Sequence, residues 1–198
     1  MASKSLTRRK VLQAIGVGIS AGASAPLLVS IESAGHMHSA LREERTRAGA
    51  YTPKFFRPDE YELLKALCGA IIPADESSGG ALEAGAPEFI DLLTSENEDY
   101  QRRLGGGLIW LNATCLKRYN AVYMECSPAE QKGILDLIAY RANRDNDSGL
   151  SPGIDFFAFL RELTVDAFAT SEIGIKYLGY IGNTFLSEFP GCPPIPDD

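Results

Sequence analysis

The sequence predicts an all-α fold, a small domain of about five helices followed by an extended tail rich in Gly, Pro and aromatic residues. Three observations predict it. Apolar residues recur at spacings of three and four along several segments, proline and acidic residues stand where these segments begin, and the alternating pattern of strands is nearly absent. Hydrophobic residues make up 45% of the 198 residues, which is enough for a packed core and too many for a disordered chain.

Two of the expected helices have clear start signals. Pro58 followed by Asp59 and Glu60 is typical of a first turn, because proline fits the first helical position and acids favour the positive end of the helix dipole. Residues 127–130, Ser-Pro-Ala-Glu, have the pattern of a capping box with proline at the first helical position. The expected helices cover about residues 58–72, 87–93, 99–119, 127–138 and 154–170.

The third and fifth of these helices carry the most distinctive patterns. Three glycines at 105–107 interrupt the third, which indicates either close helix packing or a break. Trp110 is expected in the core or at an interface. The fifth helix is apolar on nearly all sides, so it should be central or covered by a partner. The apolar stripe of the third helix consists of Leu104, Leu108, Leu111, Cys115 and Leu116.

Two adjacent arginines near the start of the chain indicate export. Arg8 and Arg9 precede an apolar run rich in glycine and alanine, residues 14–31, which is typical of a twin-arginine signal. That route carries proteins that are already folded. Glycines and Pro26 interrupt the run, so it suits a cleavable signal better than a permanent membrane span. We therefore expect a periplasmic protein with a leader over residues 1–40, a solvated, charged linker over 41–55 and a helical domain over 56–198.

The position of cleavage stays open at this point. Residues 23–25, Ala-Ser-Ala, have small residues at the required spacing, but Pro26 follows directly. Cleavage after Ala34 or Ala40 places Glu32 or His38 where a small residue is needed. Retention of the leader as a membrane anchor is the alternative.

Charge and histidine content argue against several classes of function. Residues 1–40 carry a net charge of +3 and the whole chain −7, so residues 41–198 carry −10. An acidic domain repels phosphate backbones, so no nucleic-acid partner is expected. If cleavage falls after His36 and His38, the two histidines, the domain lacks the usual general base and the commonest metal ligand. We expect no catalytic residue, metal or cofactor on this chain.

The cysteines do not form a metal or haem motif, because no two of them have C-x-x-C spacing. Cys68 lies on an apolar stripe and is expected to be a buried thiol. The sequence alone does not choose among the possible pairings of Cys68, Cys115, Cys126 and Cys192.

The tail, residues 173–198, has no regular pattern and many apolar residues. Such a segment would be a liability in water, so it should lie on another surface. Tyr177, Tyr180 and Phe189, together with Trp110, are the candidate partner contacts.

Five parts of the chain are distinctive in combination: residues 56–73, Glu83-Ala84-Gly85-Ala86-Pro87-Glu88-Phe89-Ile90-Asp91, the box at 127–130, Leu163-Thr164-Val165, and the tail segments Gly179-Tyr180-Ile181-Gly182-Asn183 and Phe189-Pro190-Gly191-Cys192-Pro193. Together they resemble the gluconate 2-dehydrogenase subunit 3 family over about residues 55–195. The tail and the first helix with its loop are the more specific parts, since the individual helices are generic.

The resemblance implies a non-catalytic small subunit of a periplasmic, membrane-associated dehydrogenase of sugars, polyols or glucosides. Its catalytic partner is expected to be a flavoprotein of the glucose-methanol-choline type that holds FAD, and a cytochrome c subunit often accepts the electrons. The small subunit escorts the flavoprotein through the twin-arginine translocase and stabilises it. In some relatives a cysteine near the C-terminus bonds covalently to the catalytic subunit. Cys192 is the matching candidate, and an internal disulfide with Cys115 or Cys126, or a free thiol, are the alternatives.

A different class of function is a stand-alone exported helical enzyme or ligand-binding protein. Its site would have to be supplied by loop acids, for example Asp75, Glu76 and Glu83.

Overall fold

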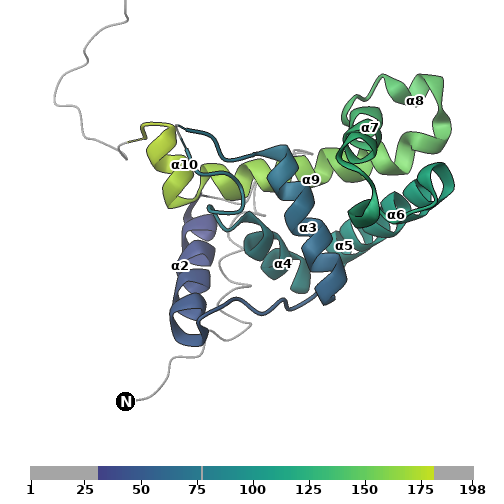
Figure 1. Ribbon diagram of the computed structural model, residues 1–198. Helices are drawn as coiled ribbons and strands as arrows, with labels where there is room; N and C mark the ends of the chain where they lie inside the picture. The colour runs from purple at the N-terminus through teal and green to yellow at the C-terminus, as the bar shows by residue number, and fades with distance from the viewer. Residues whose placement is uncertain (1–30, 77, 181–198) are drawn as a thin grey trace, which may run out of the picture.

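The computed structural model describes residues 31–76 and 78–180, which form helices and connecting loops without a β-strand (Figure 1). The predicted all-α fold class is confirmed, and each of the five expected helices is present. The elements are α2 (Ile31–Ala48), α3 (Pro58–Ile71), α4 (Ala86–Ser95), α5 (Glu98–Tyr100), the π-helical η1 (Gln101–Gly105), α6 (Gly106–Tyr119), the 3₁₀ turn η2 (Tyr123–Glu125), α7 (Pro128–Ala139), α8 (Asn143–Asn146), the 3₁₀ turn η3 (Ser148–Leu150), α9 (Ser151–Ala169) and α10 (Glu172–Tyr177).

Helix α9 is the centre of the arrangement. It runs along the length of the described structure, and α3, α4, α6, α7 and α10 pack against it (Figure 1). Most of its apolar residues are buried, which confirms the expected central position; Val165, 46% exposed, is an exception. The buried side chains include Ile154, Phe156, Phe157, Phe159, Leu160, Leu163 and Phe168.

Two glycines let α6 and α9 approach each other closely. A Cβ on Gly107 would lie 1.9 Å from the ring of Phe156, and a Cβ on Gly153 would lie 2.1 Å from the ring of Trp110. Gly105 and Gly106 keep right-handed helical dihedrals, and the chain passes from η1 into α6 without a break. Close packing is therefore the correct interpretation of Gly107, whereas a Cβ on Gly105 or Gly106 would meet nothing closer than 4.0 Å, and a π-helical segment stands in place of a break.

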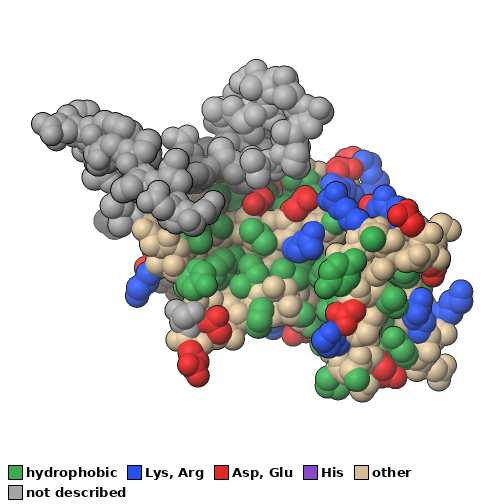
Figure 2. Space-filling model, turned by 90° about the horizontal axis from the view of Figure 1, so that it is seen from above, with side chains coloured by type: hydrophobic (Ala, Val, Ile, Leu, Met, Phe, Trp, Pro, Cys, Tyr) green, Lys and Arg blue, Asp and Glu red, His purple; other side chains and the backbone are tan. Residues whose placement is uncertain are grey.

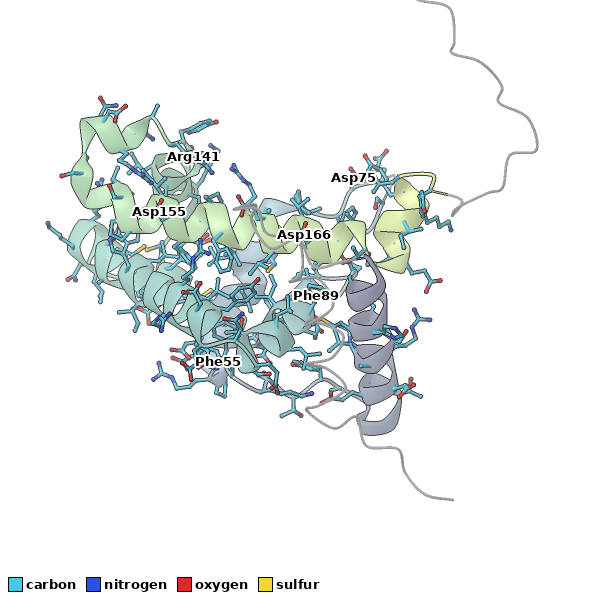
Figure 3. The ribbon with its side chains drawn as sticks, turned by 180° about the vertical axis from the view of Figure 1, so that it is seen from behind. Phe55, Asp75, Phe89, Arg141, Asp155 and Asp166 are labelled. Carbon is cyan, nitrogen blue, oxygen red and sulfur yellow. The ribbon has the colours of Figure 1, made fainter. Side chains whose placement is uncertain are left out.

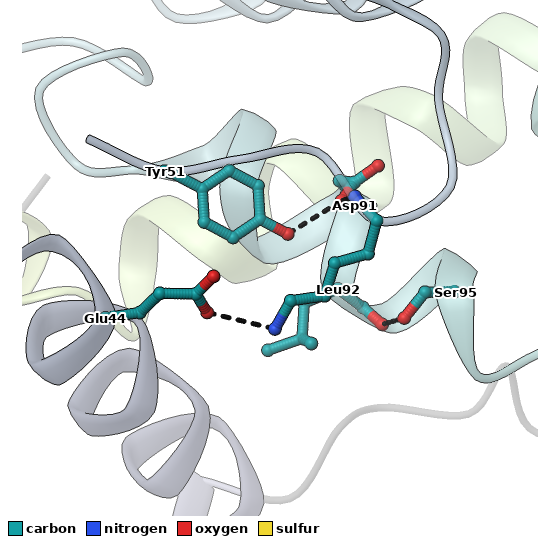
Figure 4. Close-up of polar contacts among 6 residues, drawn as sticks. Glu44, Tyr51, Asp91, Leu92 and Ser95 are labelled. Atoms are coloured by element: carbon teal, nitrogen blue, oxygen red, sulfur yellow. Dashed lines mark hydrogen bonds and ion pairs between the residues drawn. The ribbon is translucent and has the colours of Figure 1, made fainter. Parts of the chain in front are cut away.

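A buried carboxylate holds the irregular segment between α2 and α3. Asp91 of α4 has no exposed surface. Its Oδ2 accepts hydrogen bonds from the Tyr51 hydroxyl (Figure 4) and the Lys54 amide, both at 2.6 Å, and its Oδ1 accepts from the amides of Phe55 at 3.1 Å and Phe56 at 3.0 Å. Burial, followed by the bond to Asp91, raises the pKa of Tyr51. These four donors compensate the desolvated charge and attach the segment to α4.

The predicted solvated linker is wrong for residues 41–48, which form the second half of α2. Ala34, Met37 and Leu41 recur at helical spacing, are nearly or fully buried and belong to the main core, where α2 packs against α4. The apolar face of α2 thus lies mainly in residues 34–41, of which the sequence assigned 34–40 to the leader and Leu41 to the linker. The part beyond Leu41 is charged and looks like a linker when it is read alone. Residues 49–55 are irregular, as predicted.

The expected tail begins as a helix, since α10 occupies Glu172–Tyr177. Its remainder, residues 181–198, lies outside the described residues, as does the export signal. Within residues 31–76 and 78–180, no helix has both the length and the apolar character needed to cross a membrane.

We predict that Asp91→Asn lowers the free energy of unfolding by about 3 kcal/mol, because the amide nitrogen cannot accept a hydrogen bond and buried donors lose their charged acceptor. Chemical denaturation measures this change. Asp136→Asn is the matched control; Asp136 pairs with Lys132 and is 57% exposed, so its loss should cost about 0.5 kcal/mol or less. Equal effects of the two substitutions would contradict the assigned role of Asp91.

Candidate partner-binding surface

Three apolar side chains are exposed at and just after the end of α10. Tyr177, Leu178 and Tyr180 are 55%, 61% and 51% exposed, and we call them the α10 apolar end. Tyr177 and Tyr180 are two of the predicted partner contacts. Large apolar side chains exposed together are typical of a surface that meets another molecule.

The backbone around α10 is fixed by its junction with α9. The Ser171 hydroxyl donates to the carbonyl of Phe168 at 2.7 Å and accepts from the amide of Gly174 at 3.0 Å, so it caps α10. A Cβ on Gly174 would lie 1.9 Å from the Phe168 carbonyl oxygen, so only glycine fits this approach. The Tyr177 ring meets the Phe168 ring edgewise at 6.3 Å. The α10 apolar end is thus held in place by packing at the end of α9.

The structure gives Trp110 a packing role. Its side chain is half-buried, and its ring fills the space left by Gly153 at the start of α9. Trp110 meets Gly153 at the start of α9 and α10 follows the end of α9, at the other end of that helix in Figure 1, so the structure does not bring Trp110 together with Tyr177 and Tyr180. The other predicted site residues, Arg8, Arg9, Phe189 and Cys192, lie outside the described residues.

A second group of exposed apolar residues lies on α6, where the sequence analysis did not expect one. Ile109 is 67% exposed and Leu116 49%, with the exposed Ala113 between them at helical spacing. The placement of Leu116 on the buried stripe is therefore wrong. The buried stripe ends at Cys115, one position earlier and about 100° around the helix. The sequence already indicated a second apolar face, because apolar residues occur on both sides of α6.

Apolar and charged side chains are unevenly distributed on the face seen from above. Figure 2 shows hydrophobic side chains gathered in the left half and centre of this view, while Lys, Arg, Asp and Glu side chains are more frequent toward the right. The uneven distribution is what a binding surface requires, because charged residues are depleted at the centre of protein interfaces.

A cavity of about 390 Å³ lies between α2, the loop before α4, and α10. Ion pairs cross it: Arg42 lies 3.3 Å from Glu172, and Arg45 pairs with Glu88. The second oxygen, Oε2, of Glu88 is buried and accepts no hydrogen bond from the described residues. Burial keeps this oxygen from solvent, so the carboxylate interacts mainly through Arg45. Its lining comprises His38, Leu41, Arg42, Arg45, Glu83, Ala84, Gly85, Glu88, Ser171, Glu172, Ile173 and Lys176.

His38 packs against the described helices. A domain without histidine was expected only if cleavage falls after His38. Its ring stacks on Phe89 with a centroid distance of 4.9 Å, and Phe89 lies between α4 and α2 (Figure 3). Its Nε2 is 3.1 Å from Thr170 Oγ1. Thr170 already donates to the carbonyl of Asp166 at 2.6 Å, so it accepts from the imidazole N–H. Both the ring face and the N–H of His38 are thus used in packing.

Several polar groups near the cavity have structural partners. Ser171 is committed to capping α10. Of the loop acids proposed for a stand-alone site, Asp75 accepts from the amide of Ser78 at 2.9 Å and Glu83 from the amide of Gly80 at 2.9 Å, while Glu76 is exposed. No cluster of three or more His, Cys, Asp or Glu side chains suited to a metal occurs among the described residues. The loop acids Asp75 and Glu83 therefore shape the loop and are not gathered into a site.

The three described cysteines are buried free thiols. Cys68 lies 3.7 Å from the Thr164 hydroxyl, and burial raises its pKa to about 12. Cys115 and Cys126 are neighbours; burial, and then the neighbouring Cys126, raise the pKa of Cys115 to about 12. Buried thiols with raised pKa values are poor nucleophiles. The prediction of a buried Cys68 is confirmed.

The comparisons with known proteins give one match. A family model described as gluconate 2-dehydrogenase subunit 3 matches residues 58–191, which extends from the start of α3 past α10. No curated protein and no solved structure matches the chain.

We predict that His38 makes the protein less stable in acid. Burial, and secondarily the charge of Arg42, lower the pKa of His38 below 6.5, while a bond to the backbone of Ala167 acts in the opposite direction. The unfolded chain then binds more protons, so the free energy of unfolding falls as the pH drops below about 6.5.

Denaturation of His38→Gln between about pH 7.5 and 5 should therefore show a shallower acid decrease than the wild type. The control is His36→Gln, since His36 is exposed on the same helix. An unchanged slope in His38→Gln would show that His38 is not held neutral by the fold.

Proposed function

Because the chain belongs to the gluconate 2-dehydrogenase subunit 3 family, we propose that it is the non-catalytic small subunit of an FAD-dependent dehydrogenase of sugars, polyols or glucosides. It binds and stabilises a flavoprotein of the glucose-methanol-choline type and escorts it through the twin-arginine translocase to the periplasm. The observation that carries the proposal is the family match over residues 58–191. FAD belongs to the partner, and a cytochrome c subunit takes the electrons onward.

The geometry of the domain supports a binding role. The α10 apolar end is rigidly presented, and the tail that follows it carries Phe189 and Cys192. The resemblance to the family supports pairing of Cys192 with the partner, with an internal disulfide to Cys115 or Cys126, or a free thiol, as the alternatives. Association with the membrane comes through the complex or through a retained leader.

The proposal predicts that export of the flavoprotein depends on the arginine pair of this chain. Arg8→Lys/Arg9→Lys should abolish most flavin-linked sugar dehydrogenase activity in the periplasm and leave the flavoprotein in the cytoplasm, because the partner lacks a signal of its own. The measurement is activity and bound flavin in separated cell fractions. Arg102→Lys/Arg103→Lys, the other adjacent arginine pair, is the matched control and should leave export intact. Normal periplasmic activity in the first double variant would refute the escort role.

A further prediction concerns the α10 apolar end. Tyr177→Asp and Tyr180→Asp should each weaken binding of the flavoprotein by about tenfold or more, since buried interface aromatics contribute about 2 kcal/mol or more. Co-purification from the native host, followed by the flavin absorbance, measures this. Tyr140→Asp is the control, because Tyr140 is 65% exposed at the end of α7, away from α10. If all three variants retain flavin equally, the α10 apolar end is not the contact.

A further inference from the structure

We propose that α2 stays with the domain in the exported protein and that the export signal is removed N-terminal to Ile31. This inference rests on the proposed twin-arginine export. It concerns the position at which the export signal is cleaved. It places the end of the leader before Ile31 and not at residue 40.

The apolar face of α2 is part of the core. Ala34 is completely buried, and Met37 and Leu41 are 6% and 5% exposed. These residues lie on either side of the two candidate cleavage points after Ala34 and Ala40. A signal peptidase needs an accessible, extended chain. Cleavage would first require α2 to unwind and leave the core, at its first turn for the point after Ala34 and at its middle for the point after Ala40.

Polar contacts attach the same helix to three others. The His38 ring stacks on Phe89 of α4, and its Nε2 bonds to Thr170 at the end of α9. Arg45 pairs with Glu88 of α4, and Arg42 with Glu172 of α10. Cleavage after Ala40 would remove His38 and leave Phe89 uncovered on that side. The mature domain would lose part of its own core.

These contacts oppose cleavage within α2 because folding precedes export and cleavage. A protein on the twin-arginine route is folded before it crosses, so α2 is already packed when the peptidase acts. Residues 21–23, Ala-Gly-Ala, have small residues at the required spacing, with Ser24 following and no proline next to the bond. The part of the apolar run that precedes it, residues 14–20, has a length at the lower end of the usual 7–15 residues of a signal. The expected mature N-terminus is therefore Ser24.

The test is the intact mass and the N-terminal sequence of the periplasmic protein, purified from the native host with a C-terminal tag. A start at Ser24, or elsewhere before Ile31, supports the inference. A periplasmic chain that begins at Gly35 or Leu41, or one that keeps its whole leader, overturns it while the proposed export stands. A full-length chain found only in the cytoplasm overturns both.

A second measurement tests the packing of α2 in the full-length chain. Leu41→Asp should lower the melting temperature by about 10 °C, because it buries a charge. Ser39→Asp, exposed on the same helix, should leave it nearly unchanged. Equal melting temperatures in the two variants would show that α2 does not belong to the stable domain, and would overturn the inference.

Discussion

The arrangement of the helices depends on the buried carboxylate of Asp91. The segment from Tyr51 to Phe56 has no regular structure, so its amides cannot satisfy one another. Asp91 supplies two acceptor oxygens from the neighbouring helix, and four donors of the segment converge on them. The segment joins α2 to α3, and both helices pack against α4, which carries Asp91. One carboxylate thus fixes the path of the chain between two helices and the helix that they share.

The contacts of α9 depend on the absence of side chains at a few positions. Gly107 and Gly153 bring α6 against α9, with the rings of Phe156 and Trp110 occupying the space where Cβ atoms would be. Gly174 brings the start of α10 onto the last carbonyls of α9. Interiors are packed at crystal-like density, so a methyl group at any of these sites would move a helix. The position of the α10 apolar end is therefore determined by this backbone contact together with the packing of the Tyr177 ring on Phe168.

Local signals predicted the helices, and tertiary contacts explain what the sequence could not predict. Pro58 and the box at Ser127 mark helix starts by hydrogen bonding within a few residues, and both starts are where they were expected. The acceptor role of Asp91 depends on donors 35 to 40 residues away, and no local pattern reveals it. Helix α2 was missed because its apolar residues adjoin the apolar export signal, and a packed helix and a signal share that composition. In the candidate surface, Tyr177 and Tyr180 were predicted as partner contacts from the apolar tail. The exposed row on α6 could be assigned to the surface only once the orientation of that helix against the core was known.

The cavity end of the molecule brings together the two segments on which the proposed function depends. α2 follows directly on the export signal, and α10 precedes the tail that is proposed to meet the flavoprotein. These two helices meet through Arg42 and Glu172 across the cavity, and both contact the last turn of α9. α10 and α2 are therefore held together by an exposed ion pair and by the end of α9 that they share. The same end of the described structure thus carries the helix that follows the proposed export signal in the sequence and the exposed side chains proposed to meet the flavoprotein.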